Sequence, residues 1–305
     1  MIHFYRKKKI FFIFSGILFL IGIAAIIING VNLDIQFKGG AVLKYFYQGE
    51  INPDLVAEKA GNVLDRIVSA SEIEDIATGE KRLVLSLAGE YGMESSEQGM
   101  LDAALKEEFP DAGLELSESS VVEPFFGKRF LRNGIIAIVL SCILIVLYVW
   151  FSFRKIGGLS AGVMALVALF HDLLIVFFTY VIFQIPIGDS FIAVALSILG
   201  YSINDTIVVY DRIRENSRIR DKMPLEDLVD LSISQSLTRS INTNICVTVA
   251  VAMIYIFAFG YGIDSIQSFA LPMAVGSISG CYSTICIAGP LWVMWKKHKQ
   301  NKIAA

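Results

Sequence analysis

The side chains best suited to chemistry are polar or ionisable groups inside otherwise apolar stretches. Asp205 lies in one such stretch, and Arg239 stands at the start of the next. Loss of water disfavours a charged carboxylate, whereas a nearby guanidinium favours it. A carboxyl group balanced between these effects can bind and release a proton. We therefore predict a proton relay of Asp205 and Arg239; in the alternative, Asp205 is a neutral hydrogen-bonding group and Arg239 a surface anchor.

Other polar residues accompany this pair. His171 and Asp172 lie near the middle of a further apolar stretch, and Asn204 and Thr206 flank Asp205. Adjacent residues on a helix point to different faces, so a structural hydrogen-bonding role is favoured for His171 and Asp172. A polar cluster embedded in the membrane is the alternative. We expect all four residues to support the relay.

The same residue types could belong to an enzyme, but their spacing does not fit one. The segment Gly200–Asn204 lacks the second glycine of a nucleophile elbow, and the sequence contains neither a His-Glu-x-x-His motif nor a phosphate-binding loop. The cysteines lack metal-ligand spacing. We expect no enzymatic activity, no cofactor and no metal ion.

The composition indicates that these residues are held by a membrane bundle. Hydrophobic residues make up 55% of the 305 residues and charged residues only 18%, and the mean hydropathy is positive. A helix needs about 20 apolar residues to cross a bilayer. The stretches that approach this length are Ile10–Ile28, Gly134–Phe153, Leu159–Phe183, Ser190–Tyr210, Asn242–Phe259 and Phe269–Trp295. The sequence predicts six transmembrane helices.

Positive charge predicts the orientation of this bundle, because cytoplasmic flanks carry the excess of Lys and Arg. Basic clusters lie before the first stretch and after the second, fourth and sixth, whereas Gln184–Asp189 and Gly260–Ser268 contain no Lys or Arg. We expect a multi-pass protein of the bacterial cytoplasmic (inner) membrane with both termini cytoplasmic. The first helix is expected to be an uncleaved anchor, since no cleavage site follows it.

Residues 30–132 are long enough to fold as a separate extracytoplasmic domain. Their pattern predicts a strand at Ala41–Tyr47, a helix at Pro53–Val68, strands at Ile73–Ala77 and Lys81–Ala88, a helix at Ser95–Phe109 and a strand at Gly113–Val122. This order suits a ferredoxin-like α+β sandwich. The segment has 10 Lys and Arg against 19 Asp and Glu, so no nucleic-acid partner is expected.

The remaining boundaries follow from these assignments. Residues 1–29 hold the N-terminus and first helix, residues 133–295 hold the other five helices with a cytoplasmic loop at 211–241, and residues 296–305 form a cytoplasmic tail. Within the loop, Pro224–Leu237 has an apolar side and is expected to lie on the membrane surface. Gly276 and Gly280 form a small-xxx-small pattern that is typical of close helix packing.

The segment Gly200–Asn216, which reads GYSINDTIVVYDRIREN, closely resembles the signature of the SecF subunits of bacterial protein export. Further matches occur in the same order along the chain. They are Phe37–Gly40, Val122–Gly127, His171-Asp172, Ser236–Ile241 and Gly280–Ser283. The family has an Asp where this chain has Gln36, which weakens any role for that carboxylate.

The resemblance implies a six-helix bundle of the resistance-nodulation-division superfamily that works with SecD beside the SecYEG channel. Such a subunit uses the proton-motive force to move a translocating polypeptide. SecA would be an indirect partner through the channel, and membrane lipid would surround the bundle. Asp205 and Arg239 match the family's proton-transport residues. Gly39, Gly40, Gly200, Asp211 and Arg212 belong to its motifs. A stand-alone proton-driven exporter of the same superfamily is the main alternative, and a purely structural scaffold that only steadies the channel is a weaker one.

Overall fold

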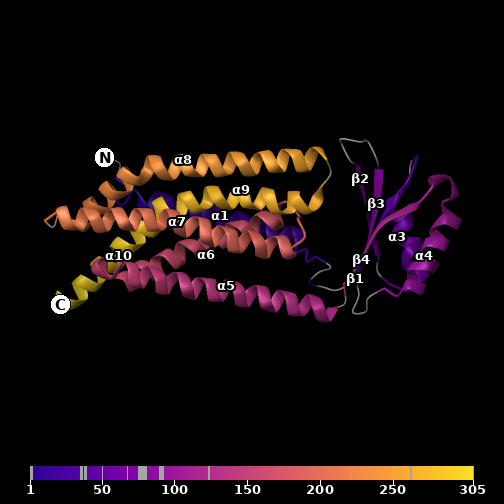
Figure 1. The fold of residues 1–305 in the computed structure, drawn as a ribbon, viewed down its shortest axis with the longest axis horizontal. Helices are drawn as coiled ribbons and strands as arrows, with labels where there is room; N and C mark the ends of the chain where they lie inside the picture. Colours follow the sequence, from indigo (N-terminus) through magenta and orange to yellow (C-terminus); the bar gives the residue numbers. More distant parts are fainter. Residues whose placement is uncertain are drawn as a thin grey trace.

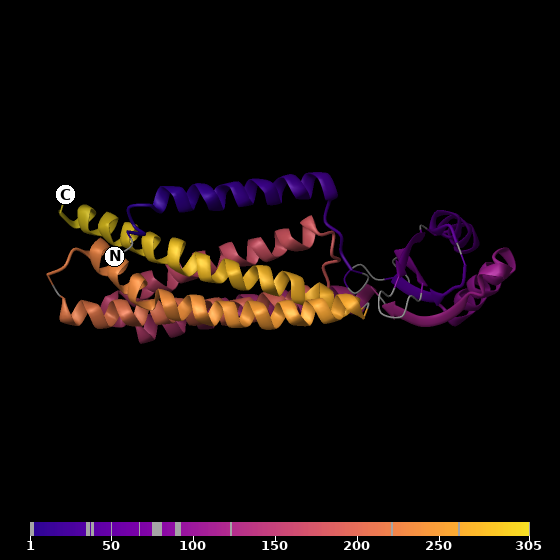
Figure 2. The same ribbon diagram turned by 90° about the horizontal axis from the view of Figure 1, so that it is seen from above.

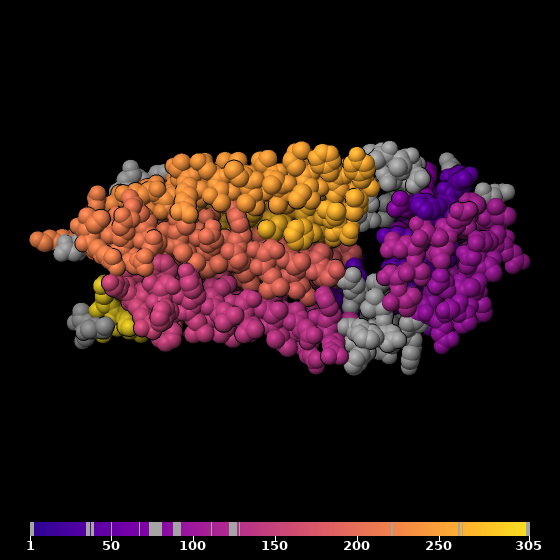
Figure 3. Space-filling view, viewed as in Figure 1, coloured from indigo at the N-terminus to yellow at the C-terminus, as the bar shows by residue number. Residues whose placement is uncertain are grey.

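The computed structural model consists of a helical bundle with a small sheet domain at one end (Figure 1). It describes residues 3–304 except 35, 36, 38, 39, 50, 67, 75–80, 89–92, 123, 221 and 262. Both termini lie at the end of the bundle away from the sheet, as the views from two directions show (Figures 1 and 2). The space-filling view shows the bundle and the sheet domain as two separate lobes (Figure 3).

Six helices of the described chain are long and apolar enough to cross a membrane. The segments that contain them are α1 (Lys8–Asn29), α5 (Pro124–Ser152), α6 (Gly158–Ile182), α7 (Asp189–Ile219), α8 (Leu225–Gly260), and α9 (Asp264–Ser283) together with α10 (Gly289–Ala304). Each coincides with one of the stretches predicted from the sequence. The protein is therefore a multi-pass membrane protein.

The bundle has a buried centre and an exposed periphery. Helices α6, α7 and α9 bury more than half of their membrane-crossing windows within the chain, whereas α1, α5 and α8 bury only a small share. Large apolar side chains cover the exposed faces of these three outer helices. Tyr282 of α9 donates a hydrogen bond to the Phe11 carbonyl oxygen at 2.7 Å and so ties α1 to the centre.

The segment 211–241, expected to be a loop, is mostly helical. Helix α7 continues to Ile219, and α8 begins at Leu225 and runs without a break to Gly260. The expected separate surface helix at Pro224–Leu237 is thus the first part of α8. Two physical reasons explain this: no Gly or Pro interrupts 225–259, and the apolar side of the segment packs on the start of α10. Val229 and Ile233 are fully buried there beside Gly289.

The last apolar stretch is also longer than expected and is bent. Helix α9 passes into a π-helical turn, η3 (Thr284–Ala288), before α10 begins at Gly289. Pro290 lacks a backbone N–H, and such residues and π-turns are the usual sites of helix kinks. In Figure 1, α10 leaves the axis of α9 and crosses the end of the bundle.

The sheet domain contains β1 (Gly40–Phe46), α3 (Pro53–Leu64), β2 (Val68–Glu74), β3 (Lys81–Ala88), α4 (Ser95–Glu108), η1 (Pro110–Ala112) and β4 (Glu115–Val122). The strands form one antiparallel sheet in the order β2-β3-β1-β4. Both helices lie on the face of the sheet away from the bundle (Figure 1). Between them and the sheet is a core of apolar side chains that includes Leu43, Leu83, Leu85, Leu101 and Leu105.

The sequence places most of these elements correctly, but it extends the helix of α3 to Val68 and misplaces β2. The strand begins at Val68 and not at Ile73, because α3 ends at Leu64 and Asp65 turns the chain with a φ of 50°. Residues 75–77 of the expected strand lie outside the described residues. Burial in this apolar core raises the pKa of the Tyr45 hydroxyl.

Short contacts tie the entrance of the sheet domain to the bundle. The backbone N–H of Asp34 donates to the Ile187 carbonyl oxygen at 3.0 Å, and Ile187 donates to Asn32 at 2.9 Å. Phe37 is buried at this end of the bundle. Gly40 then opens β1 with a φ of 136°, a conformation that favours glycine. Gly39 and Gln36 lie outside the described residues.

Candidate functional site

Asp205 lies in the interior of the bundle. Its side chain projects from α7, is 3% exposed, and its Oδ2 atom is buried without a hydrogen-bond partner in the described chain. Tyr201, one turn earlier on α7, also has a buried hydroxyl that lacks a described partner. A buried carboxyl group without hydrogen bonds is costly to keep charged. This environment leaves the carboxyl oxygen available to a proton.

Arg239 interacts with Asp205 electrostatically, without direct contact. Its positive charge acts on the Asp205 carboxyl group, but no hydrogen bond or ion pair within the described chain joins the two side chains. Arg239 lies on α8, the neighbour of α7, and its side chain is exposed. The pair that the sequence predicts is therefore close enough to interact but is not in contact in this structure.

Asp172 accepts more hydrogen bonds than any other side chain in the described part of the bundle. It is fully buried on α6. Its Oδ2 atom accepts hydrogen bonds from Ser202 of α7 and Ser283 of α9, and Oδ1 accepts one from Ser279 of α9; each is 2.7 Å long. One carboxyl group thus connects the three central helices.

His171 adds a second ionisable group to this cluster. Its Nδ1 atom lies 3.2 Å from Asp172 Oδ1, although neighbouring residues on a helix normally diverge. The ring lies between Phe19 of α1 and Tyr282 of α9, with centroid distances of 5.2 and 5.9 Å. Its Nε2 atom is buried without a described partner. The pair therefore forms a membrane-embedded polar cluster that is also a set of structural hydrogen bonds.

Glycines on α9 make these contacts sterically possible. A Cβ atom on Gly280 would lie 3.0 Å from Ser202 Cβ, and one on Gly276 would lie 2.7 Å from Val176 Cγ2. The α9 backbone therefore packs directly on α7 and α6 inside this chain. Gly200 differs, because a Cβ atom there would meet nothing within 4 Å.

The two residues that flank Asp205 separate in the structure. Thr206 is buried, and its hydroxyl lies 2.8 Å from the Thr284 hydroxyl of η3. Asn204 is exposed on the outside of the bundle. Only Thr206 therefore lies with the interior polar groups.

The far end of α7 forms a second polar junction. Arg212 Nε donates to Gln235 Oε1 of α8 at 2.8 Å, and Asn216 Nδ2 donates to the same oxygen at 2.8 Å. Asp211 is exposed and pairs with Arg214. Arg212 thus fastens α7 to α8, whereas Asp211 stays at the surface.

The serines that surround Asp172 were not predicted from the sequence. Ser279 lies within the segment interpreted as a packing motif, Ser283 within a further match to the family, and Ser202 within the signature. Their spacing was the available signal: Ser279 and Ser283 are four residues apart and so share a helix face. Among the residues that the structure describes, no group of three or more His, Cys, Asp and Glu could hold a metal ion.

The geometry defines a class of protein: a multi-pass membrane bundle with an isolated interior carboxyl group and a folded domain outside the bundle. Comparison with known proteins agrees. The protein-family model described as "Protein export membrane protein SecD/SecF, C-terminal" matches residues 102–298. This chain belongs to the SecD/SecF family.

Individual relatives match over nearly the whole chain. The protein translocase subunit SecF of Alicyclobacillus acidocaldarius is 30% identical over 97% of this chain and 94% of its own length. The protein translocase subunit SecDF of Bacillus subtilis is 32% identical over 99% of this chain. The chain spans only 39% of that longer relative.

Solved structures share the arrangement. A crystal structure of SecDF from Thermus thermophilus, described as a translocon-associated membrane protein, superposes with a TM-score of 0.78 at 26% identity. The match covers 97% of this chain and 39% of that one. A second structure, SecDF in a super-membrane-facing form, has a TM-score of 0.67 at 25% identity and is covered to 40%.

Proposed function

We propose that this chain is the SecF-type subunit of a Sec protein translocase and that it uses the proton-motive force to promote polypeptide export. Asp205 is the residue that binds and releases the proton. Arg239 stabilises its charged form. The observation that carries this proposal is the Asp205 carboxyl group itself, which is buried among membrane helices, lacks a hydrogen-bond partner in the described chain and feels the charge of Arg239.

The geometry suggests how the proton changes the bundle. A protonated, neutral Asp205 is stable in the observed interior position without a contact to Arg239. Once ionised, the carboxylate gains from a closer approach of the guanidinium. Arg239 lies on α8 and Asp205 on α7, so each proton would alter the attraction between these two helices. Such a change can be passed along the bundle to the sheet domain.

Partners follow from the names and lengths of the relatives. The Bacillus subtilis relative is named SecDF and is much longer than this chain, which supports SecD as the partner of this subunit. The Thermus structure is described as translocon-associated, which supports action at the SecYEG channel on a translocating polypeptide. SecA would act on the same channel and so only indirectly on this chain.

The orientation is part of the proposal. Both termini are taken as cytoplasmic and residues 30–132 as an extracytoplasmic ferredoxin-like domain, in the bacterial cytoplasmic membrane. The strand order β2-β3-β1-β4, with two helices on one face of the sheet, supports the ferredoxin-like assignment. The opposite ends occupied by the sheet and the termini support one domain outside and both termini inside.

The test is export of a secreted reporter into vesicles at constant ATP, with and without a proton gradient. Asp205→Asn keeps the shape of the side chain but cannot exchange a proton. We expect it to abolish the gradient-dependent gain and to leave gradient-independent export unchanged. Arg239→Lys keeps a charge without the guanidinium geometry and should give a partial loss.

A matched control is Glu215→Gln, which removes an exposed carboxylate from the same helix. This variant should retain the full gain. If Asp205→Asn also retained it, Asp205 would be a neutral hydrogen-bonding group and the relay would be wrong.

A further inference from the structure

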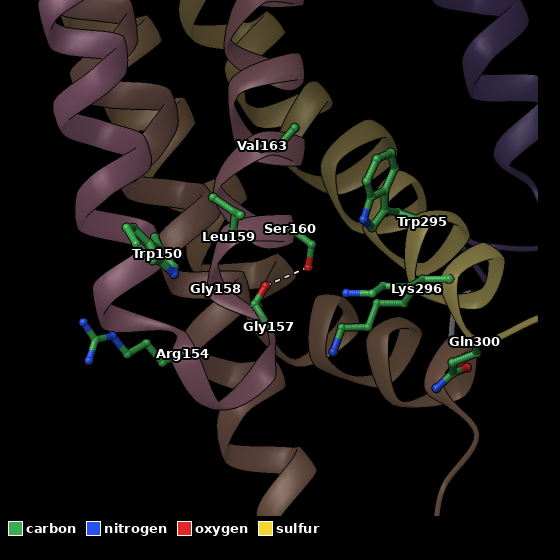
Figure 4. Close-up of a pocket in the computed structure, with 11 residues that line it drawn as sticks. Trp150, Arg154, Gly157, Gly158, Leu159, Ser160, Val163, Trp295, Lys296 and Gln300 are labelled. Carbon is green, nitrogen blue, oxygen red and sulfur yellow. Dashed lines mark hydrogen bonds between the residues drawn. The ribbon is translucent and has the colours of Figure 1, made fainter. Parts of the chain in front are cut away.

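A basic cavity lies at the end of the bundle that carries the two termini. Its volume is about 770 Å³, a size typical of small-ligand sites. One wall comes from the end of α5 and the start of α6, and the other from α10 (Figure 4). Trp150, Leu159 and Val163 face Trp295 and Lys296 across it.

The charges of the cavity are of one sign. Arg154, Lys296 and Lys299 line it, and no Asp or Glu is among its described lining residues. None of the three cations forms an ion pair within the described chain. By contrast Lys297, on the same helix but outside the cavity, pairs with Glu226 at 2.7 Å. The cavity therefore collects positive charge that the described chain does not neutralise.

The backbone around the cavity is arranged to admit Lys296. Gly157 has a φ of 93°, and a Cβ atom there would lie 3.1 Å from Lys296 Nζ. Ser160 donates to the Gly157 carbonyl oxygen at 2.7 Å and accepts a hydrogen bond from Trp292 at 3.1 Å. This small turn holds the two walls together and leaves the ammonium group at the cavity.

The cavity is also continuous with a lipid-facing surface. Leu159 and Val163 begin an exposed apolar row that continues along α6 through Val167 and Phe170. These residues are spaced by three or four positions, so they share one helix face. Tryptophan is enriched where membrane meets water, and Trp150 and Trp295 are both about half exposed beside the cations. An occupant can thus place an anionic group among the cations and an apolar chain along α6.

We propose that this cavity binds the phosphate headgroup of an anionic phospholipid. The phosphate is held by Arg154, Lys296 and Lys299, and one acyl chain follows the apolar row of α6. Basic pockets between membrane helices are suited to such headgroups. A soluble phosphate would use the same cations but would have no need of the apolar row.

The three tryptophans of the chain provide a direct probe. Trp150 and Trp295 line the cavity and Trp292 bonds to its wall through Ser160. Bromine on an acyl chain quenches tryptophan fluorescence on contact. The full chain is placed in phosphatidylcholine vesicles that contain a small share of brominated phosphatidylglycerol or the same share of brominated phosphatidylcholine. We expect stronger quenching by the brominated phosphatidylglycerol.

Two double variants separate the cavity from the general basic surface. Arg154→Gln with Lys299→Gln removes two exposed charges from the cavity, and Lys155→Gln with Lys302→Gln removes two exposed charges outside it. The first pair should lose the excess quenching and the second should keep it. Equal quenching by the two lipids, or equal losses in the two double variants, would overturn the proposal.

A final arm distinguishes lipid from soluble phosphate. Sodium phosphate is added to the vesicles and compared with sodium chloride at the same ionic strength. Equal effects of the two salts are expected for a bound lipid. If phosphate alone removed the excess quenching, the cavity would be a site for a soluble anion and the lipid assignment would be wrong.

Discussion

The sheet domain and the helical bundle have opposite interiors. In the described part of the sheet domain the buried side chains are apolar or tyrosine, and the charged side chains pair at the surface, as Lys44 does with Glu118 at 2.9 Å. In the bundle, Asp172, Asp205 and His171 are buried, and the exposed faces of α1, α5 and α8 are apolar. The two regions are folded by the same chain but for different solvents.

The difference shows what carries stability in each region. Burial of apolar area is favourable only where water is the alternative, as in the sheet domain. Inside a membrane the lipid is as apolar as leucine, so close packing and hydrogen bonds between helices must hold the bundle. Serine bonds to Asp172 and the glycine contacts of α9 supply both.

The largest expected effect is in the sheet domain. Leu85→Ala removes a fully buried side chain from its core and should cost about 2–5 kcal/mol in the free energy of unfolding. Hydrogen exchange should then increase in the sheet while the bundle keeps its protection. Leu55→Ala, at a position 54% exposed on α3, is the control and should change little. Equal protection in the two variants would contradict a core held by apolar burial.

A smaller effect is expected from overfilling the bundle. Gly276→Leu forces atoms into space occupied by Val176 and Ile198 and should cost about 1–3 kcal/mol. Thermal unfolding in detergent measures the loss. Gly200→Leu makes the same chemical change where a Cβ meets nothing and should leave the unfolding temperature unchanged. Identical unfolding temperatures for the two glycine variants would show that α9 is not tightly packed against α6 and α7 at Gly276.

The smallest effect is expected from removing hydrogen bonds to Asp172. Asp172→Asn keeps the shape and one carbonyl oxygen but replaces the other acceptor by a donor. Interhelical hydrogen bonds in membranes are worth about 1 kcal/mol or less, so the loss should be of that order. The same detergent unfolding assay can detect it. If Asp172→Asn destabilised the bundle more than Gly276→Leu, hydrogen bonding would outweigh packing in this interior.

Much of the architecture could be predicted from residue patterns. The six apolar stretches each coincide with a membrane-length helix, and Lys81–Ala88 has the same bounds in prediction and structure. These features depend on local sequence: the run of apolar residues, and the alternation of Leu83, Leu85 and Leu87. The burial of Asp205 is likewise present in the structure.

Side-chain partners were harder to predict. Arg239 was expected beside Asp205 but is exposed without an ion pair in the described chain, and Asn204 faces outward. The serine partners of Asp172, which lie up to 111 positions away in the chain, could not be identified from the sequence. A partner depends on how each helix is rotated about its axis, and that rotation is set by all the neighbouring helices together.

The sequence by itself determined the solvent of each segment, the number of membrane helices and the family, because hydrophobicity and signature residues are local properties. Only the tertiary structure decided that Asp172 joins three helices, that α8 is continuous, and that Arg154 meets Lys296 and Lys299 at one cavity. The physical reason is distance. Hydrogen bonds and ionic contacts require atoms within a few ångströms, and residues far apart in the chain come that close only when the helices pack against one another.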